Sequence, residues 1–252
     1  MGHALITAGT KGLGKKVTEA FLEKGHNVTV SYRSDVKKAE ELLTAFSSYK
    51  NNVQLIQADV TIPEDLESLV QQAVAKFGGI DYLINNAGPF IFDRKKLMDY
   101  TQQEWDDMIR GNLDSFFHLL KLTIPHMRNN RFGRVITYGF QGAHTAAGWL
   151  YRSAFAAAKV GLVSLTKTIA YEEAEYGITS NMVCPGNIVG EMKEASINES
   201  RLIPNKETPI GRSGTGADIA RTVLFLCEDD SDMITGSVFE ITGGLDVIHR
   251  YR

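Results

Sequence analysis

The chain alternates short, almost uninterrupted apolar runs with longer segments in which apolar residues recur every three or four positions. None of the short runs shows strict alternation of apolar and polar residues, which indicates parallel strands buried on both faces. The runs that predict strands are residues 3–8, 27–32, 53–60, 80–88, 133–139, 178–186 and 236–244.

The segments between these runs predict amphipathic helices. In one of them Pro63 stands at the start, two glycines stand at the end, and the apolar stripe between them is Leu66, Leu69, Val70, Ala73, Val74 and Phe77. Another helix is expected to follow Thr101, because Thr101 and Glu104 have the spacing of a capping box. Strands joined by helical crossovers predict a Rossmann-type, doubly wound parallel sheet of about seven strands in three α/β/α layers.

The composition favours one large α/β domain. Of 252 residues, 43% are hydrophobic and 23% are charged, which is enough apolar material for a sizeable core. A formal net charge of −3 lacks the basic excess that nucleic-acid binding requires, so no nucleic-acid partner is expected. No linker or shift in composition divides the chain, so residues 1–252 are expected to form a single domain.

The first residues and the cysteines predict the cellular compartment. The start, MGHALITAGTKG, lacks the charged leader and long apolar segment of a signal peptide, and no apolar run approaches the roughly 20 residues that span a bilayer. The two cysteines, Cys184 and Cys227, cannot form a disulfide framework. The six histidines lack metal-ligand spacing. We therefore expect a soluble cytoplasmic protein with no metal and no membrane partner.

Residues 187–213 are the least regular part of the chain. They are polar, contain two prolines and follow the carboxyl end of a predicted strand, where ligands bind in doubly wound sheets. We interpret this stretch as a substrate lid. An ordinary solvated loop with a short helix is the alternative.

A glycine-rich turn, TAGTKGLGKK at residues 7–16, joins the first strand to the first helix. Such a turn lets backbone N–H groups and the helix N-terminus approach a phosphate. The mononucleotide-binding pattern fits from Gly9 to Lys15, but Lys16 stands where that pattern needs a Ser or Thr to hold magnesium. The dinucleotide pattern needs Gly12 and Gly14 between strand and helix, and both are present.

Further motifs follow in order along the chain and decide between these patterns. They are TAGTKGLG at 7–14, DV at 59–60, NNAG at 85–88, GNL at 111–113, the lysine of FAAAK, CPGNI at 184–188 and the stretch from PIGRS to ITGG near the end. Together they resemble the short-chain dehydrogenase/reductase family, and within it most closely the 3-oxoacyl-thioester reductases. The resemblance extends over nearly the whole chain.

The resemblance implies a dinucleotide that lies across the carboxyl ends of the strands. The family's first glycine is Ala8 here, and the threonine that often follows the nicotinamide segment is Gly190. The residues implied to bind the pyrophosphate, adenine, ribose and nicotinamide are Ala8, Gly9, Thr10, Lys11, Gly12, Leu13, Gly14, Asp59, Val60, Asn86, Ala87, Gly88, Lys159, Pro185, Gly186 and Ile188.

The end of the second strand favours NADP over NAD. An acidic residue there would accept the ribose hydroxyls of NAD and repel a 2′-phosphate. Here Tyr32 stands near that position with Arg33 beside it, and Lys11 faces the same region in the family. Two cations near one phosphate favour NADP. Asp35 is an argument for NAD, but it lies beyond the strand, where it is interpreted as a solvated surface residue.

The catalytic residues match the family only in part. Asn112 matches the asparagine that supports a water relay, and Lys159 matches the lysine that holds the ribose and lowers the pKa of a tyrosine four residues earlier. Phe155 occupies the place of that tyrosine, and it cannot carry a proton. Phe140, followed by Gln141, occupies the place of the serine that binds the substrate oxygen.

Tyr151 is the candidate replacement for the missing tyrosine. Enoyl-thioester reductases of the same superfamily carry their tyrosine about one turn earlier and place an aromatic residue near the serine position. If the helix begins near Ser153 as its N-cap, Tyr151 lies in the preceding loop and is free to fold toward the nicotinamide. Tyr151 is then a relocated proton donor; the alternative makes it an aromatic residue in the wall of the substrate pocket. Gln141 and His144 are further polar candidates.

These observations leave three functions open. The first is an NADPH-dependent reductase of a carbonyl substrate, including 3-oxoacyl thioesters. The second is an enoyl-thioester reductase that uses the displaced Tyr151. The third is an NADP-binding protein without turnover. The family resemblance also implies a homo-oligomer, either a tetramer or a dimer.

Overall fold

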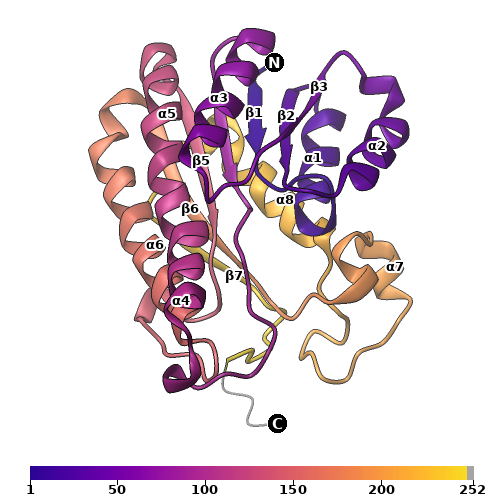
Figure 1. Cartoon of the computed structure of the whole chain (residues 1–252). Helices are drawn as coiled ribbons and strands as arrows, with labels where there is room; N and C mark the ends of the chain where they lie inside the picture. The colour runs from indigo at the N-terminus through magenta and orange to yellow at the C-terminus, as the bar shows by residue number, and fades with distance from the viewer. Residues whose placement is uncertain (249–252) are drawn as a thin grey trace.

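The computed structural model describes residues 1–248, and within them seven strands form one parallel sheet (Figure 1). The order across the sheet is β3-β2-β1-β4-β5-β6-β7, which confirms the predicted doubly wound fold. The strands are β1 His3–Ile6, β2 Asn27–Tyr32, β3 Val53–Gln57, β4 Tyr82–Asn85, β5 Gly133–Tyr138, β6 Ile178–Pro185 and β7 Val238–Ile241.

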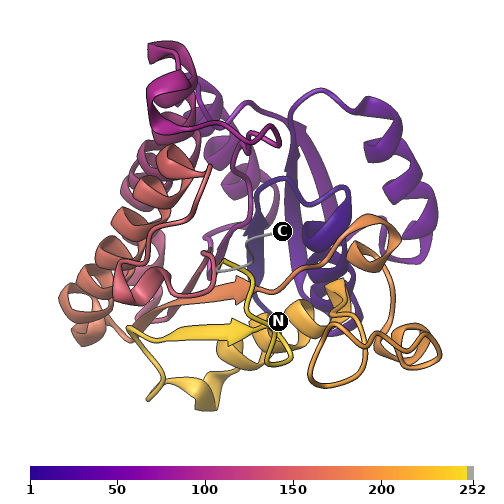
Figure 2. The same ribbon diagram turned by 90° about the horizontal axis from the view of Figure 1, so that it is seen from below.

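Helices cover both faces of this sheet, so the predicted three layers are present (Figure 2). Helices α3, α5 and α6 pack on one face, and α1, α2 and α8 pack on the other. The bounds are α1 Gly12–Glu23, α2 Val36–Ala45, α3 Pro63–Phe77, α4 Gln102–Ile109, α5 Ser115–Asn130, α6 Ser153–Glu172, α7 Ile197–Arg201 and α8 Gly216–Cys227.

Strand β1, which lies in the interior of the sheet, explains why the apolar runs lack polar alternation. Ala4, Leu5 and Ile6 of β1 are all fully buried. Successive side chains of a strand point to opposite faces, and here Leu5 joins one core cluster while Ala4 and Ile6 join the other. Since helices cover both faces, these three positions are apolar, and the polar His3 of the same strand is buried with hydrogen bonds to the Gly79 carbonyl and the Thr29 hydroxyl.

The strands end earlier than the apolar runs predict. β1 ends at Ile6 and β4 at Asn85, although the runs continue to residues 8 and 88. The residues beyond each strand turn away from the sheet at the point where the strand order reverses, between β1 and β4. Ligands bind in this crevice in doubly wound sheets.

Two predicted helix starts have different outcomes. Thr101 caps α4 as expected, and both hydrogen bonds of the capping box with Glu104 are present. The predicted N-cap at Ser153 is wrong by one residue: Ser153 is the first residue of α6, Arg152 is the N-cap, and no side chain caps the helix. The hydroxyl of Ser153 is buried without a hydrogen-bond partner.

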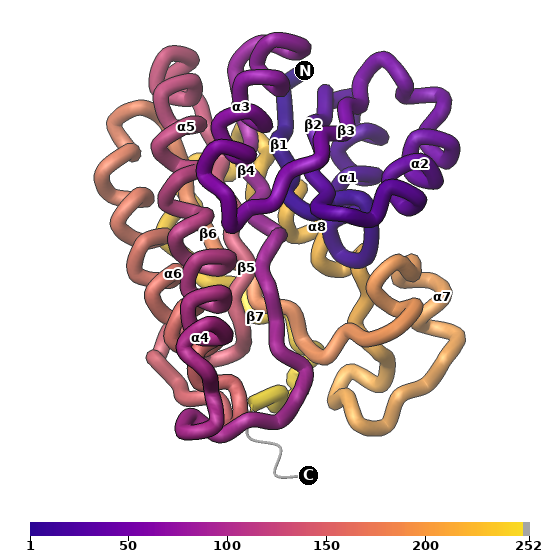
Figure 3. Tube along the Cα trace, in the orientation of Figure 1, coloured from indigo at the N-terminus to yellow at the C-terminus, as the bar shows by residue number. Residues whose placement is uncertain are grey.

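Residues 187–213 contain more structure than the sequence suggests, and we call them the lid segment (Figure 3). A 3₁₀ turn at Gly190–Lys193 and the five-residue helix α7 lie in it, and an antiparallel bridge joins Pro204 to Arg212. Its end is fixed to α8, because Arg212 donates two hydrogen bonds of 2.8 and 2.7 Å to the carboxylate of Asp218.

The Arg212–Asp218 contact predicts a pH-dependent stability. Burial opposes ionisation of Asp218, but the hydrogen bonds from Arg212 and from the backbone and hydroxyl of Thr215 prevail and lower its pKa. The contribution is therefore present above the ordinary Asp pKa and is lost as the pH falls through the lowered value. We expect Asp218→Asn to reduce the free energy of unfolding by about 1–2 kcal/mol at pH 7. Urea unfolding measures this, and the difference should shrink below about pH 4.

Asp230→Asn is the matched control, because Asp230 is an exposed aspartate just beyond the same helix. It should change the stability by less than about 0.5 kcal/mol. An equal loss in both variants would mean that net charge, and not the Arg212 contact, sets the effect.

Candidate functional site

The glycine turn at residues 7–14 is held in a shape that only small residues allow. Ala8 and Gly12 both have positive φ, at 51° and 60°. The amide of Ala8 donates to Ser31 Oγ at 3.2 Å, which ties the turn to β2. At Gly14, a Cβ atom would lie 2.5 Å from the carbonyl oxygen of Ala8 and 2.6 Å from Asn86 Nδ2. Any larger residue would therefore push the turn apart.

The segment after β4 supports the turn from the other side. Asn86 Nδ2 donates to the carbonyl oxygens of Thr7 at 3.0 Å and Ala8 at 3.1 Å. The amide of Ala87 donates to Thr7 Oγ1 at 2.9 Å. The predicted site residues Ala8, Gly14, Asn86 and Ala87 are thus brought together, as the family resemblance implies.

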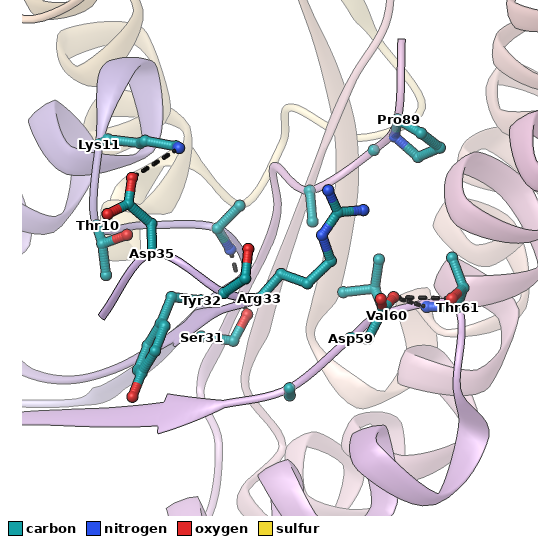
Figure 4. A pocket seen from close by; sticks show the side chains of 15 residues that line it. Thr10, Lys11, Ser31, Tyr32, Arg33, Asp35, Asp59, Val60, Thr61 and Pro89 are labelled. Carbon is teal, nitrogen blue, oxygen red and sulfur yellow. Dashed lines mark hydrogen bonds and ion pairs between the residues drawn. The ribbon is translucent and has the colours of Figure 1, made fainter. Parts of the chain in front are cut away.

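A cavity of about 290 Å³ opens beside the turn, between the carboxyl ends of β1, β2, β3 and β4 (Figure 4). Arg33 extends from the end of β2 into this cavity. The predicted residues that line the cavity are Ala8, Thr10, Lys11, Arg33, Asp59, Val60, Ala87 and Gly88. We call it the adenosine cavity, after the part of a dinucleotide that the family resemblance assigns to these residues.

Asp35 is not a plain surface aspartate, in contrast to the sequence interpretation. It lines the adenosine cavity, and its carboxylate pairs with the Lys11 ammonium at 3.1 Å (Figure 4). It also caps α2 by accepting the amide of Lys38. The hydrogen bond from Lys11 is the main reason why the pKa of Asp35 is lowered. Arg33 makes no such pair with a described carboxylate within residues 1–248.

Asp59 is fixed by its own neighbours. Its carboxylate accepts the amide of Thr61 at 2.9 Å and the Thr61 hydroxyl at 2.8 Å, while its amide donates to Asp65. This arrangement holds the Asp59–Val60 backbone at the rim of the cavity.

Asn112 lies at the opposite end of the site, in an irregular helical turn. Residues Arg110–Asp114 form a π-helical turn between α4 and α5, a geometry found frequently at functional sites. The Asn112 amide nitrogen donates to the carbonyl oxygens of Pro89 and Met108, each at 3.0 Å. Its Oδ1 atom is buried without a hydrogen-bond partner and lies against Gly88. A buried orphan acceptor of this kind is suited to a water or a ligand hydroxyl.

Lys159 lies beside the same glycine and is almost fully buried. Its side chain is 4% exposed, and a Cβ atom on Gly88 would lie 3.6 Å from its Nζ. Burial lowers the pKa of Lys159 to about 8, because the ammonium loses hydration without gaining a carboxylate partner. The ammonium stands over the ring of Phe155, 5.4 Å from its centroid.

Aromatic rings occupy positions 140 and 155, where the family resemblance implies hydroxyl groups. Phe140 is 3% exposed and packs against Trp149 with ring centroids 5.2 Å apart. Phe155 packs edge-on against Phe90 at 4.9 Å and against Trp149 at 6.0 Å. We call Phe90, Phe140, Trp149 and Phe155 the aromatic cluster. Phe90 is absent from the sequence-based prediction; the available signal was its position two residues after the NNAG motif.

Tyr151 lies in the loop before α6, as predicted, but in a strained conformation. Its φ is 65°, which is unusual for a bulky residue, and the Arg94 guanidinium lies 4.7 Å from its ring centroid. It lines a second cavity of about 290 Å³ together with Phe90, Trp149 and Leu150, and Lys159 is not part of that lining. The structure therefore brings Lys159 and Asn112 to one glycine and leaves Tyr151 in the neighbouring cavity.

Gln141 and His144 are both held by partners. Gln141 Oε1 accepts the amide of Val247 at 2.5 Å. His144 Nδ1 lies 3.4 Å from a carboxylate oxygen of Glu240, and the same oxygen accepts the amide of Gly142. Both side chains therefore brace loops in this structure.

The end of β6 completes the predicted set. Gly186 is needed for close packing, since a Cβ atom there would lie 2.9 Å from Thr242 Cα. Ile188 is buried beyond it, with its amide donating to the Gly186 carbonyl oxygen at 2.9 Å. Pro185 is the last residue of the strand. These three residues define the side of the crevice from which the lid segment departs.

Two features are absent from residues 1–248. These residues contain no group of three or more His, Cys, Asp or Glu side chains that could hold a metal ion. None of the helices there has both the length and the apolar character to cross a membrane.

The chain is similar to known proteins along almost its full length. The 62% identical Bacillus subtilis protein named "Putative oxidoreductase YtkK" aligns over 99% of this chain and 98% of its own. A Staphylococcus aureus 3-oxoacyl-[acyl-carrier-protein] reductase, FabG, is 34% identical over 96% of this chain and 97% of its own. A solved structure from Bacillus thuringiensis, named "Structure of putative 3-oxoacyl-reductase", superposes with a TM-score of 0.94 at 62% identity and covers 99% of this chain and 100% of that one.

A family model described as "Enoyl-(Acyl carrier protein) reductase" matches residues 7–246, from the glycine turn to the segment after β7. The match and the relatives confirm the resemblance that the ordered motifs indicated. The chain belongs to the short-chain dehydrogenase/reductase family of oxidoreductases.

Proposed function

We propose that this protein is an NADP(H)-dependent reductase of carbonyl substrates, including 3-oxoacyl thioesters. The observation that carries the proposal is that the groups expected to bind the cofactor lie side by side in the structure. They are the adenosine cavity with Arg33, the glycine turn, and Asn112 and Lys159 beside Gly88. The FabG relatives support the substrate class, because their name describes reductases of 3-oxoacyl groups on a carrier protein.

The described residues fit a dinucleotide. Ala8, Gly12 and Gly14 leave the turn open to the backbone approach that a pyrophosphate needs. The orphan Asn112 Oδ1 and the buried Lys159 ammonium offer an acceptor and a donor to ribose hydroxyls or to water. A bound nicotinamide cofactor would supply the hydride, and the protein would supply position and a proton.

Arg33 and Lys11 support NADP as the preferred form. A guanidinium can hold a 2′-phosphate through two hydrogen bonds, and Arg33 projects into the cavity from the strand end. Asp35 would repel a phosphate if it were alone, but Lys11 neutralises it at 3.1 Å. Arg33, Lys11 and Asp35 together carry one net positive charge, while Asp59, which also lines the cavity, accepts hydrogen bonds from the amide and hydroxyl of Thr61.

Lys159 is proposed as the source of the proton for carbonyl reduction. Phe155 stands where the family carries a tyrosine and has no hydroxyl to donate a proton. The Lys159 ammonium is an ionisable group that stands over the Phe155 ring. With its pKa lowered to about 8, the ammonium can release a proton near neutral pH, which a normal lysine does poorly. Asn112 would hold a water that returns the proton to Lys159 from solvent.

Enoyl-thioester reduction is the second candidate function. The displaced Tyr151 favours it, because its hydroxyl lies in a loop at the edge of the aromatic cluster and is free to bind a thioester oxygen. The description of the matching family model is in keeping with this chemistry. The aromatic cluster would suit a flat, conjugated substrate equally well.

Oligomer formation and location are also proposed from family membership. A homo-oligomer, tetramer or dimer, would cover Phe117 on α5 and Phe225 on α8, which are 51% and 48% exposed. A cytoplasmic location agrees with two buried free thiols, Cys184 and Cys227. Light scattering that gives a monomer at micromolar concentration would contradict the oligomer.

The substrate assay separates the two candidate reactions. We expect NADPH oxidation with acetoacetyl thioesters, and little change in its rate for Tyr151→Phe, because Lys159 carries the proton. Turnover of crotonyl thioesters alone, lost in Tyr151→Phe, would instead establish enoyl reduction. NADPH binding without oxidation of either substrate would leave a binding protein.

Restoring the tyrosine tests the role assigned to Phe155. Phe155→Tyr places a phenol next to the Lys159 ammonium, and we expect kcat with acetoacetyl thioester to rise about 10- to 100-fold. The wild-type rate should fall as the pH rises through about 8, because the ammonium loses its proton there. Phe92→Tyr is the matched control, since Phe92 is 78% exposed on the loop after β4 and should leave kcat unchanged.

Cofactor preference is tested at Arg33. Arg33→Ala should raise the Kd for NADPH about 10- to 100-fold, because charge-assisted hydrogen bonds to the phosphate are lost, and should leave the Kd for NADH nearly unchanged. Lys37→Ala is the control, because Lys37 is an exposed lysine on α2 outside the lining of the adenosine cavity. Equal weakening of both cofactors would rule out a 2′-phosphate contact.

A further inference from the structure

A carboxylate from the lid segment occupies the start of α1. Glu194 follows the 3₁₀ turn at Gly190–Lys193, and its Oε1 accepts the backbone amide of Gly12 at 2.8 Å. Its Oε2 accepts a hydrogen bond from the Lys15 ammonium at 2.6 Å. These contacts join residues about 180 positions apart, and Figure 3 shows the lid segment passing beside the start of α1.

The helix itself provides no anion at this end. α1 has no acidic residue in its first turn, and its N-cap residue, Lys11, makes no side-chain cap. The first amides of a helix lack intrahelical partners and carry a partial positive charge, so they attract an anion. Glu194 supplies that anion in this structure.

The carboxylate is ionised in this position. Burial raises the pKa of Glu194, but the hydrogen bonds from Lys15 and from the Gly12 amide, with the charges of Lys15 and Lys38, lower it overall. A protonated acid would accept these two donors far less well. Glu194 therefore presents a full negative charge to the glycine turn at neutral pH.

The surrounding chain holds Glu194 in place. The Lys193 side chain lies against Gly12, with its Cδ atom 3.8 Å from where a Cβ would stand. The Lys193 carbonyl oxygen lies against Gly216 at the start of α8, where a Cβ would meet it at 2.0 Å. The lid segment is thus packed between the starts of α1 and α8 when Glu194 reaches the turn.

We propose that Glu194 takes the place of the cofactor's pyrophosphate at the glycine turn and has to withdraw for the cofactor to bind. This inference rests on the proposed NADP(H) site, since the same amides are expected to hold the pyrophosphate. A carboxylate and a pyrophosphate repel each other at one helix N-terminus, so the two cannot occupy it together. Lid opening and cofactor binding are thereby coupled, and Glu194 sets the affinity for the cofactor.

The test measures binding and needs no turnover. NADPH is titrated into wild type and Glu194→Gln, and the Kd is obtained from the change in NADPH fluorescence. We expect Glu194→Gln to bind NADPH about three- to ten-fold more tightly, because a neutral amide competes weakly for the Gly12 amide and Lys15. Glu191→Gln removes the same charge from an exposed position of the lid and should leave the Kd unchanged.

A second probe confines the effect to the pyrophosphate position. Adenosine 2′-monophosphate carries the groups that the adenosine cavity would hold and lacks the pyrophosphate. Wild type and Glu194→Gln should bind it equally, which also shows that the variant is folded. In amide hydrogen exchange, the Gly12 amide should be protected in wild type and exchange faster in Glu194→Gln.

The outcomes separate the inference from the proposed function. Unchanged or weaker NADPH binding by Glu194→Gln, with 2′-monophosphate binding intact, overturns the role of Glu194 alone; weaker binding would mean that Glu194 closes the lid over the cofactor. Tighter binding of both probes would mean a general charge effect and also overturns it. Failure of wild type to bind either probe overturns the NADP(H) site and the inference together.

Discussion

The first backbone amides of α1, which have no partner within the helix, are the constraint on which the rest of this site depends. They need a partner that the helix does not provide, since neither an acidic first turn nor a side-chain cap is present. The turn that exposes them is kept open by small residues, above all Gly14, and is tied by Asn86 to the neighbouring strand. An anion has to come from outside the helix, either from a cofactor or from the lid segment.

At the other end of the site, Lys159 has no tyrosine four residues before it, because position 155 is a phenylalanine. In the family this lysine acts on a tyrosine, and here it faces the ring of Phe155. Burial, with no carboxylate partner among residues 1–248, lowers the pKa of the ammonium to about 8. Phe140 is buried and Phe155 is partly buried, and both rings pack against Trp149 in the aromatic cluster.

The glycine turn could be predicted because local backbone geometry requires small residues there, as Gly12 and Gly14 show. Asn112 and Lys159 were predicted from the resemblance of the GNL and FAAAK motifs to the family, and the structure brings both residues to Gly88. Phe90 and Glu194 could not be predicted in the same way. Phe90 joins the aromatic cluster through contacts with rings about 60 residues away, and Glu194 reaches a turn about 180 residues earlier. Asp35 was interpreted as a surface residue because it lies beyond the strand; its pairing with Lys11 joins residues 24 positions apart.

The sequence by itself determined the parallel sheet, its two covered faces and the glycine turn, because periodicity and turn chemistry act over a few residues. Asn112 and Lys159 were predicted from the family resemblance of the ordered motifs. The sequence also determined that no tyrosine stands four residues before Lys159. The tertiary structure decided which side chains meet. It placed Tyr151 under Arg94 in a neighbouring cavity, since the φ of one loop residue sets the direction of its ring. It also brought Glu194 to the start of α1, since the direction of the lid segment depends on packing against α8.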